Sequence, residues 1–324
     1  MNPQNKLCNA WIYIGDDAPN GTNYNSPDSA YQRLVKENIY RSVDILFISF
    51  VTTFPTGDNT IPLGDGSCYT IGVDESTPNN AGHPGGLTNS YYFDQIIEAA
   101  KLNNPGIVVS STLAWGEASI LSNIFNNPTS PPSASDEEKA TQFANNLLQF
   151  LDAKGLNGFD IDWEAPIASD GINVNQFVLL INAIGKVFQQ QENKYYLTLS
   201  PSMLGVICDQ HNNAATNAIN TYVDFLNLQL YGQQQQSCPG QDPAPLNDLF
   251  VRAGVDADKL AYGAKFESGY QTASQAYCGL NGFPAYYPNY KVITQWRLNS
   301  GNFQFEQENQ VELFQLVHNN TPCS

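Results

Sequence analysis

Basic side chains are scarce in this chain. Of its 324 residues only 14 are Lys or Arg, against 31 Asp or Glu, which gives a formal net charge of −17. Such a charge repels nucleic acid and anionic membrane surfaces, so we expect neither as a partner. Charged residues make up only 14% of the chain, so Asn, Gln, Ser and Thr must supply much of the polar surface. A neutral polar ligand such as a sugar would meet no electrostatic penalty.

Long apolar runs and clustered metal ligands are also missing. No run of about 20 apolar residues occurs, which argues against a membrane-spanning helix. The three histidines are scattered and no C-x-x-C pair is present, so we expect no zinc or redox site, no other metal and no cofactor. The chain opens on a polar stretch, so it is either cytosolic or has lost its signal peptide. Six widely spaced cysteines and few lysines favour a secreted, extracellular protein.

Strand-like apolar runs alternate with helix-like runs along the chain. The strand-like runs are continuously apolar, as is typical of parallel strands buried on both faces. A Gly-, Pro-, Asn- and Thr-rich stretch over about 54–87 predicts one long loop after the second strand. The pattern predicts an α/β fold: a single (β/α)8 TIM barrel domain over residues 1–324. Strands are expected at 11–14, 43–52, 106–113, 157–164, 195–200, 223–231, 260–266 and 291–296, and helices at 28–41, 89–102, 136–153, 174–190 and 306–318.

A closed barrel of this kind also suggests one disulfide bond. Cys8 precedes the first strand and Cys323 follows the last helix, so both would lie at the amino-terminal end of the barrel. Cys278, after the seventh strand, would lie at the opposite end. We therefore expect a Cys8–Cys323 bond, because closing so long a loop would stabilise the fold by roughly 4–5 kcal/mol.

Residues 157–164 read Asn-Gly-Phe-Asp-Ile-Asp-Trp-Glu. Side chains of a strand point alternately to its two faces, so Asp160, Asp162 and Glu164 would share one face and the apolar residues the other. Three crowded carboxylates should raise the pKa of at least one of them. A site that needs a protonated acid beside an ionised one has a reason to bear this cost. The alternative is an edge strand with its acidic side in water, which the large apolar residues disfavour.

This octet resembles the D-G-x-D-x-D-x-E signature of the family 18 glycoside hydrolases, the chitinases and endo-β-N-acetylglucosaminidases. Asn157 replaces the first Asp, outside the core triplet. The resemblance implies a retaining, substrate-assisted mechanism. Glu164 would act as general acid and then activate water. Asp162 would orient the substrate's N-acetyl group and stabilise an oxazolinium ion, and Asp160 would modulate Asp162.

Aromatic residues are expected at the same rim, because barrel active sites lie at the carboxyl ends of the strands. Tyr231 and Trp296 would end the sixth and eighth strands, and Trp115 follows the third. Aromatic rings present apolar faces to sugar C–H groups, although either Tyr231 or Trp296 alone could be a packing residue. The resemblance implies that Tyr231 binds the acetamido carbonyl and that Trp296 forms the floor at the cleavage point.

Further substrate-binding positions follow from the same resemblance. It assigns Gln229 and Phe50 to substrate binding, and Tyr13, in the first predicted strand, is a further substrate-binding candidate. Two departures from the family pattern leave the shape of the site and part of its hydrogen bonding to substrate open. Leu113-Ala114 stand where the family has two glycines, and Gly232 replaces an Asp or Asn.

Together these features predict a retaining hydrolase that cleaves β-1,4-linked N-acetylglucosamine polymers, a chitinase acting as a monomer on chitin or N-acetylglucosamine oligosaccharides. Two alternatives remain: an endo-β-N-acetylglucosaminidase acting on the N-glycan core, and an inactive chitinase-like lectin or inhibitor. The intact acidic triplet and Tyr231 disfavour inactivity. Carboxylate crowding predicts an acidic pH optimum, in the region of about pH 4–6.5.

Overall fold

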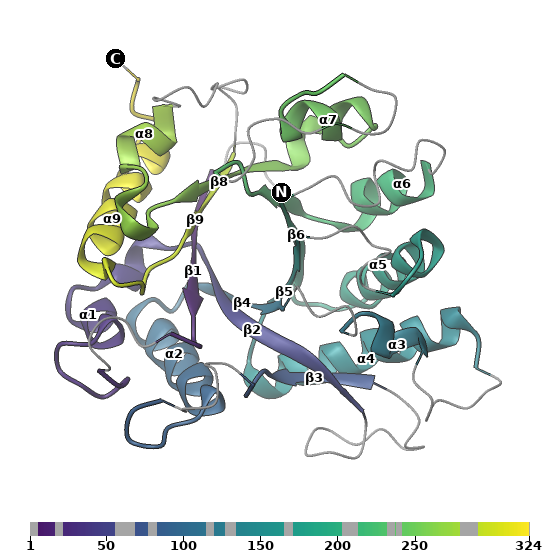
Figure 1. Cartoon of the computed structure of the whole chain (residues 1–324), viewed down its shortest axis with the longest axis horizontal. Helices are drawn as coiled ribbons and strands as arrows, with labels where there is room; N and C mark the ends of the chain where they lie inside the picture. The colour runs from purple at the N-terminus through teal and green to yellow at the C-terminus, as the bar shows by residue number, and fades with distance from the viewer. Residues whose placement is uncertain are drawn as a thin grey trace.

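The protein is described here from a computed structural model. It describes residues 6–16, 22–55, 69–76, 83–114, 120–126, 134–164, 171–202, 213–231, 237, 242–278 and 291–323. Viewed down its short axis, the chain forms a ring of strands surrounded by helices (Figure 1). The strands are β1 (Leu7–Tyr13), β2 (Ile45–Pro55), β3 (Tyr69–Val73), β4 (Val108–Leu113), β5 (Gly158–Trp163), β6 (Tyr196–Pro201), β7 (Phe225–Leu228), β8 (Leu260–Lys265) and β9 (Val292–Trp296).

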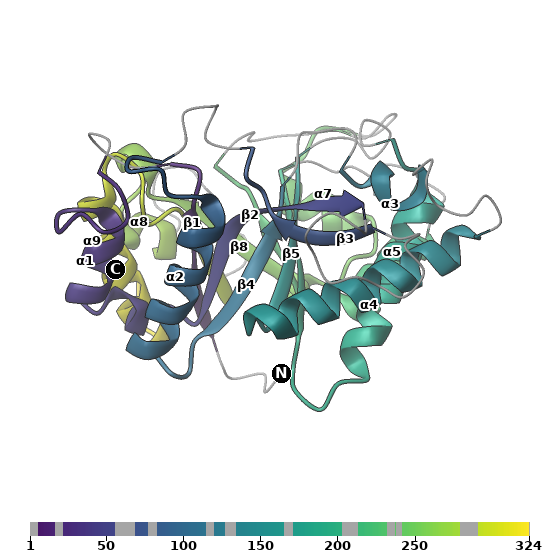
Figure 2. The same ribbon diagram turned by 90° about the horizontal axis from the view of Figure 1, so that it is seen from below.

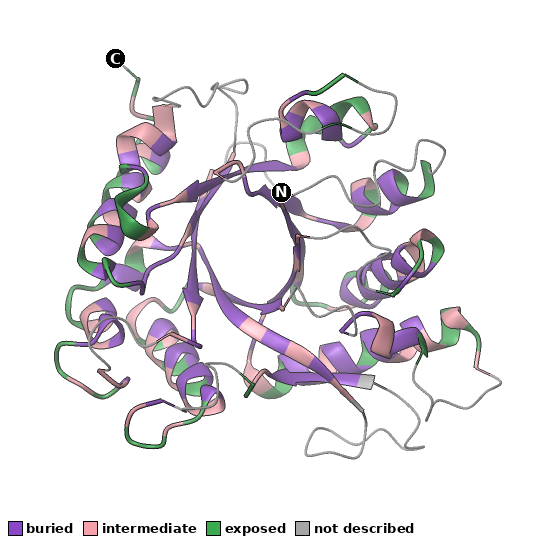
Figure 3. Cartoon of the chain, in the orientation of Figure 1, coloured by how far each residue is buried: buried purple, intermediate pink, exposed green. Residues whose placement is uncertain are grey.

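The sheet closes on itself. Its order is β1-β9-β8-β7-β6-β5-β4-β2-β3, and β1 also pairs with β2. All the pairings around the ring are parallel. The predicted (β/α)8 barrel is therefore confirmed. The strands are buried, and the surrounding helices turn their buried faces inward and their exposed faces outward (Figure 3).

One strand lies outside the barrel. β3 pairs antiparallel with the far half of β2, from Val51 opposite Val73 to Pro55 opposite Tyr69, and runs beside it in the side view (Figure 2). The stretch predicted as one structureless loop therefore contains a strand. Its short sequence Tyr-Thr-Ile-Gly-Val is rich in residues that favour strands, but only pairing with β2 gives it a partner.

The helices are α1 (Ala30–Lys36), α2 (Asn89–Asn103), α3 (Ser122–Asn126), α4 (Asp136–Lys154), α5 (Val174–Gln189), α6 (Asn213–Tyr222), α7 (Leu246–Arg252), α8 (Ala273–Cys278) and α9 (Phe303–His318). The start of α4 is a capping box in which Ser135 and Glu138 bond each other's backbone N–H, as the sequence indicates. Gly155 ends α4 in the left-handed region, with φ of 67°. The predicted helix over 28–41 is instead α1 and a 3-10 turn, separated at Asn38, where φ is 55°.

The disulfide prediction is wrong. Cys278 bonds to Cys323, with their Cα atoms 5.5 Å apart, and Cys8 is a buried free thiol that accepts a hydrogen bond from Gln310 Nε2 at 3.3 Å. The reason is α8, which the sequence pattern did not reveal. It packs against α9, and this brings its last residue, Cys278, beside the segment that follows α9. Cys68, Cys208 and Cys238 lie outside the described residues.

Candidate active site

The acidic strand β5 lies between β4 and β6, and its register sets the surroundings of Asp160. Asp160 is opposite Thr112 on one side and Thr198 on the other. Its fully buried carboxylate accepts hydrogen bonds from Thr198 Oγ1 at 2.5 Å and from Ser200 Oγ at 2.9 Å. The apolar residues of β5 are buried in the core. The predicted division of β5 into an acidic and an apolar face is therefore present.

Burial raises the pKa of the two aspartates. It raises the pKa of Asp160 to about 6, although hydrogen bonds from neighbouring hydroxyls oppose the shift. Burial also raises the pKa of Asp162 well above its usual range, and the charges of Glu164 and Asp160 add to this effect. The expectation that at least one carboxyl has a raised pKa is therefore confirmed, but burial rather than crowding is the main cause.

Gln229 connects Asp162 to Tyr231. Its Nε2 donates to Asp162 Oδ1 and to the backbone oxygen of Ser200, both at 2.9 Å. Its Oε1 accepts from the Tyr231 hydroxyl at 3.0 Å. β7 ends at Leu228, so both residues follow the strand rather than ending it. Burial, followed by the charges of Asp162 and Glu164, raises the pKa of Tyr231, which keeps its hydroxyl available as a donor.

The predicted aromatic residues come together on the other side of the mouth. The ring of Tyr13 lies 5.6 Å from that of Phe50 and 6.5 Å from that of Trp296. Trp296 also lies 6.1 Å from Trp11, whose indole N–H donates to Thr112 at 3.2 Å. The candidate site thus combines carboxylates from β5, a phenol after β7 and aromatic rings from β1, β2 and β9. Trp115 and Gly232 lie outside the described residues.

A chain of ion pairs at the same mouth was not foreseen. Arg297 pairs with Asp16 at 2.6 Å and with Glu267 at 3.0 Å, and Glu267 also pairs with Lys265 at 2.9 Å. The Arg297 guanidinium lies over the Tyr13 ring, 5.3 Å from its centre, and therefore helps to hold this predicted substrate-binding residue in place. These four residues carry no shared motif, so their grouping depends on the closure of the barrel.

The hydroxyl residues around Asp160 were also missed. Thr198 and Ser200 alternate within β6, which places both on the face that Asp160 meets. Hydroxyl residues at alternate positions of an otherwise apolar strand predict a polar partner on that face, because buried polar groups need hydrogen-bond partners. Asn227 extends the network, donating to Ser200 Oγ at 3.3 Å and accepting from Thr294 at 2.6 Å.

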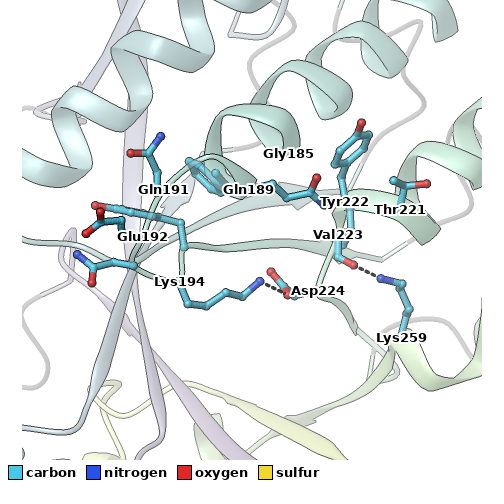
Figure 4. Close-up of a pocket in the computed structure, with 13 residues that line it drawn as sticks. Gly185, Gln189, Gln191, Glu192, Lys194, Thr221, Tyr222, Val223, Asp224 and Lys259 are labelled. Carbon is cyan, nitrogen blue, oxygen red and sulfur yellow. Dashed lines mark hydrogen bonds and ion pairs between the residues drawn. The ribbon is translucent and has the colours of Figure 1, made fainter. Parts of the chain in front are cut away.

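A separate pocket of about 320 Å³ lies at the opposite end of the barrel. Its walls come from the ends of α5 and α6 and from the segments that lead into β6, β7 and β8. Lys194 pairs with Asp224 at 2.5 Å, and Lys259 donates to the Val223 backbone oxygen at 2.5 Å (Figure 4). Because it opens where strands begin, this pocket takes no part in the site around β5.

Within the described residues, no three His, Cys, Asp or Glu side chains are grouped so that they could hold a metal ion. The same part of the chain contains no helix long and apolar enough to cross a membrane.

Two comparisons with known proteins bear on the family and the fold. The sequence profile described as "Glycosyl hydrolases family 18" matches residues 20–311. Similar solved structures include the chitinase-like agglutinin RobpsCRA from Robinia pseudoacacia, 13% identical with a TM-score of 0.58, covering 95% of this chain and 99% of that one. A putative chitinase A from Streptomyces coelicolor is 16% identical with a TM-score of 0.56, and the coverages are 97% and 99%.

A third similar structure is that of human YKL-39, determined in the presence of chitooligosaccharides. It is 14% identical with a TM-score of 0.60, and the match covers 97% of this chain and 98% of that one. At these identities the likenesses show a common fold. These similar structures include a protein named as a putative chitinase and one described as a pseudo-chitinase.

Proposed function

The chain belongs to the family 18 glycosyl hydrolases, and from this premise we propose that it is a retaining, substrate-assisted hydrolase of β-1,4-linked N-acetylglucosamine polymers, a chitinase. One observation carries the proposal above all others. Asp162 lies beside Glu164 and is held by Gln229, which also binds the Tyr231 hydroxyl. An inactive binding protein has no need to bury an aspartate with a raised pKa beside a second carboxyl group.

In the proposed reaction, Glu164 gives its proton to the glycosidic oxygen as the bond to the anomeric carbon breaks. The carbonyl oxygen of the substrate's own N-acetyl group attacks that carbon and forms an oxazolinium ion. Asp162 accepts a hydrogen bond from the acetamido N–H and stabilises the positive charge, while the Tyr231 hydroxyl turns from Gln229 Oε1 to donate to the acetamido oxygen. The Glu164 carboxylate then takes a proton from a water molecule, whose oxygen bonds to the anomeric carbon as the bond to the acetamido oxygen breaks. The oxazolinium ring opens, and two successive displacements retain the configuration.

Asp160 acts in this scheme through Asp162. It is fully buried, and the hydroxyl groups of Thr198 and Ser200 donate hydrogen bonds to its carboxyl. A carboxyl whose pKa is about 6 can hold a proton in mild acid and so reduce the negative charge that Asp162 meets. Tyr13, Phe50 and Trp296 would form the apolar wall against which the sugar lies.

The proposal extends to the protein's setting. We propose that it acts as a monomer, outside the cell, on chitin or chitooligosaccharides. Structural relatives support the ligand class, since human YKL-39 is described as retaining chitooligosaccharide binding.

Product analysis tests the proposed substrate. Incubation with N-acetylglucosamine oligomers, followed by mass spectrometry, is expected to yield shorter oligomers with unchanged acetyl groups. A high-mannose glycopeptide is the second substrate. Cleavage of the glycopeptide alone would replace the proposal with an endo-β-N-acetylglucosaminidase. Binding of oligomers without any product would make the protein a carbohydrate-binding member of the family.

A thiazoline analogue of the oxazolinium ion should inhibit the enzyme competitively. The analogue reproduces the shape and charge of the intermediate, and enzymes bind such analogues more tightly than their substrates. Initial rates on a chitooligosaccharide at increasing inhibitor concentration measure the effect. Full activity at millimolar analogue would argue against attack by the N-acetyl group and favour a protein nucleophile.

Activity should be highest in mild acid and decline as the pH rises through about 6, the raised pKa of Asp160. Burial raises the pKa values of Asp160 and Asp162, so their protonated forms persist to higher pH than those of ordinary aspartates. A reaction that needs a proton held by this pair is supported below these pKa values and lost above them. The pH profile of kcat/KM measures this, and an optimum above pH 8 would contradict the assignment.

A further inference from the structure

Tyr270 is an exposed aromatic side chain at the mouth of the barrel. It directly follows the 3-10 turn Glu267–Gly269 after β8, and 49% of its surface is exposed. Its hydroxyl donates to the backbone oxygen of Tyr231 at 3.4 Å. The other exposed large apolar residues of the described chain, Leu102 and Val251, lie near the carboxyl ends of α2 and α7. Tyr270 alone among these three therefore lies beside the candidate active site.

The turn before Tyr270 has an unusual backbone. Ser268 and Gly269 both adopt the left-handed region, with φ of 58° and 72°. Such a conformation is uncommon for a residue other than glycine and persists only where the surrounding structure holds it. Two backbone hydrogen bonds close the turn: Gly269 N–H donates to the Phe266 oxygen at 3.0 Å and Tyr270 N–H to the Glu267 oxygen at 3.2 Å.

Side chains fix this turn from two directions. Glu267 accepts from Arg297 Nε at 3.0 Å and pairs with Lys265. After the turn, the buried Gln271 accepts from the Lys265 backbone N–H at 3.1 Å and donates to the Tyr262 hydroxyl at 3.1 Å. The Tyr270 backbone is thus anchored on both sides. Binding a ligand to the ring would cost little further ordering of the backbone.

We propose that Tyr270 forms a sugar-stacking subsite that extends the candidate active site away from the point of cleavage. The ligand class is a neutral β-linked N-acetylglucosamine unit of a longer chain, whose C–H face would lie on the exposed ring. This inference rests on the proposed function, since Tyr231 is the residue proposed to hold the N-acetyl group of the reacting sugar. The charged residues just before Tyr270 are paired, Glu267 with Lys265 and with Arg297, which suits an uncharged ligand.

The experiment measures binding of N-acetylglucosamine oligomers, from dimer to hexamer, by calorimetry in the Glu164→Gln background, where hydrolysis does not interfere. Tyr270→Ala should weaken binding of the hexamer about tenfold, or about 1.4 kcal/mol, and leave the shortest bound oligomer unaffected. Tyr270→Phe keeps the ring and loses only the hydroxyl, so it should bind like the parent. Leu102→Ala removes an exposed side chain elsewhere and serves as the matched control.

Three outcomes would overturn the subsite. Equal binding of the hexamer by the Ala variant and the parent would show that the ring makes no contact. An equal loss for all lengths, or a loss in the Phe variant as large as in the Ala variant, would mean that Tyr270 acts by positioning Tyr231. Thermal unfolding confirms that each variant is folded. If the wild-type protein neither binds nor cleaves any oligomer, the proposed function itself fails, a result separate from a normal parent with an unaffected variant.

Discussion

Replacement of Glu164 by Gln is expected to lower kcat on chitooligosaccharides by about 10²–10⁴-fold, the usual contribution of a positioned acid. The amide has nearly the same shape and still forms hydrogen bonds, but it cannot give a proton to the glycosidic oxygen or take one from water. Ground-state binding should therefore remain close to that of the wild type, and the loss should appear in kcat rather than in KM. Steady-state kinetics and calorimetric binding measure the two effects separately.

The matched control is Glu312→Gln, which changes an exposed glutamate of α9 in the same way. Its kinetics should equal those of the wild type, so that any loss in the Glu164 variant reflects position rather than charge. An undiminished kcat for Glu164→Gln would refute its role as the acid. A variant that no longer binds oligosaccharide yet unfolds normally would instead place Glu164 in substrate recognition.

Removal of the Cys278–Cys323 bond should produce the largest change in stability. The bond joins residues 45 positions apart, and the loop-entropy relation gives about 4 kcal/mol for a loop of that length, an upper estimate where the unfolded chain keeps residual structure. The double variant Cys278→Ser, Cys323→Ser should therefore unfold at a clearly lower denaturant concentration. Equilibrium unfolding in guanidinium, followed by tryptophan fluorescence, gives the difference.

The control is the same pair of proteins in a strong reductant. Wild type and variant should become similar there, because the bond is absent from both. An equal midpoint without reductant would contradict the contribution of this bond. The effect on turnover should be small, since Cys278 ends α8 and Cys323 follows α9, away from the residues of the candidate site.

Local pattern was sufficient to predict the barrel and the acidic strand. Continuous apolar runs mark buried parallel strands wherever they fold, and the capping box at Ser135 and the αL residue Gly155 fix the limits of α4 without reference to the rest of the chain. The alternation of acidic and apolar residues in β5 follows from the geometry of a single strand. These features depend on residues close to each other in the chain, so they can be predicted from the sequence alone.

The short elements were harder to predict. α3, α7 and α8 span two turns or less, too few residues for a helical period to stand out. A helix of that length is marginal by itself and forms because tertiary packing supports it. Missing α8 led directly to the wrong partner for Cys323, because that helix determines where Cys278 lies.

Sequence alone determined which side chains would form the acidic face of β5, and tertiary structure decided what each of them meets. Asp160 and Thr198 are 38 positions apart, Asp162 and Gln229 are 67 apart, and Arg297 and Asp16 are 281 apart. The register of parallel strands and the closure of β9 on β1 bring these pairs into contact. Burial, the main cause of the raised pKa values of Asp160 and Asp162, is likewise a property of the closed barrel. A single strand fixes the direction of its own side chains, but the assembled sheet sets their neighbours and their exposure to water.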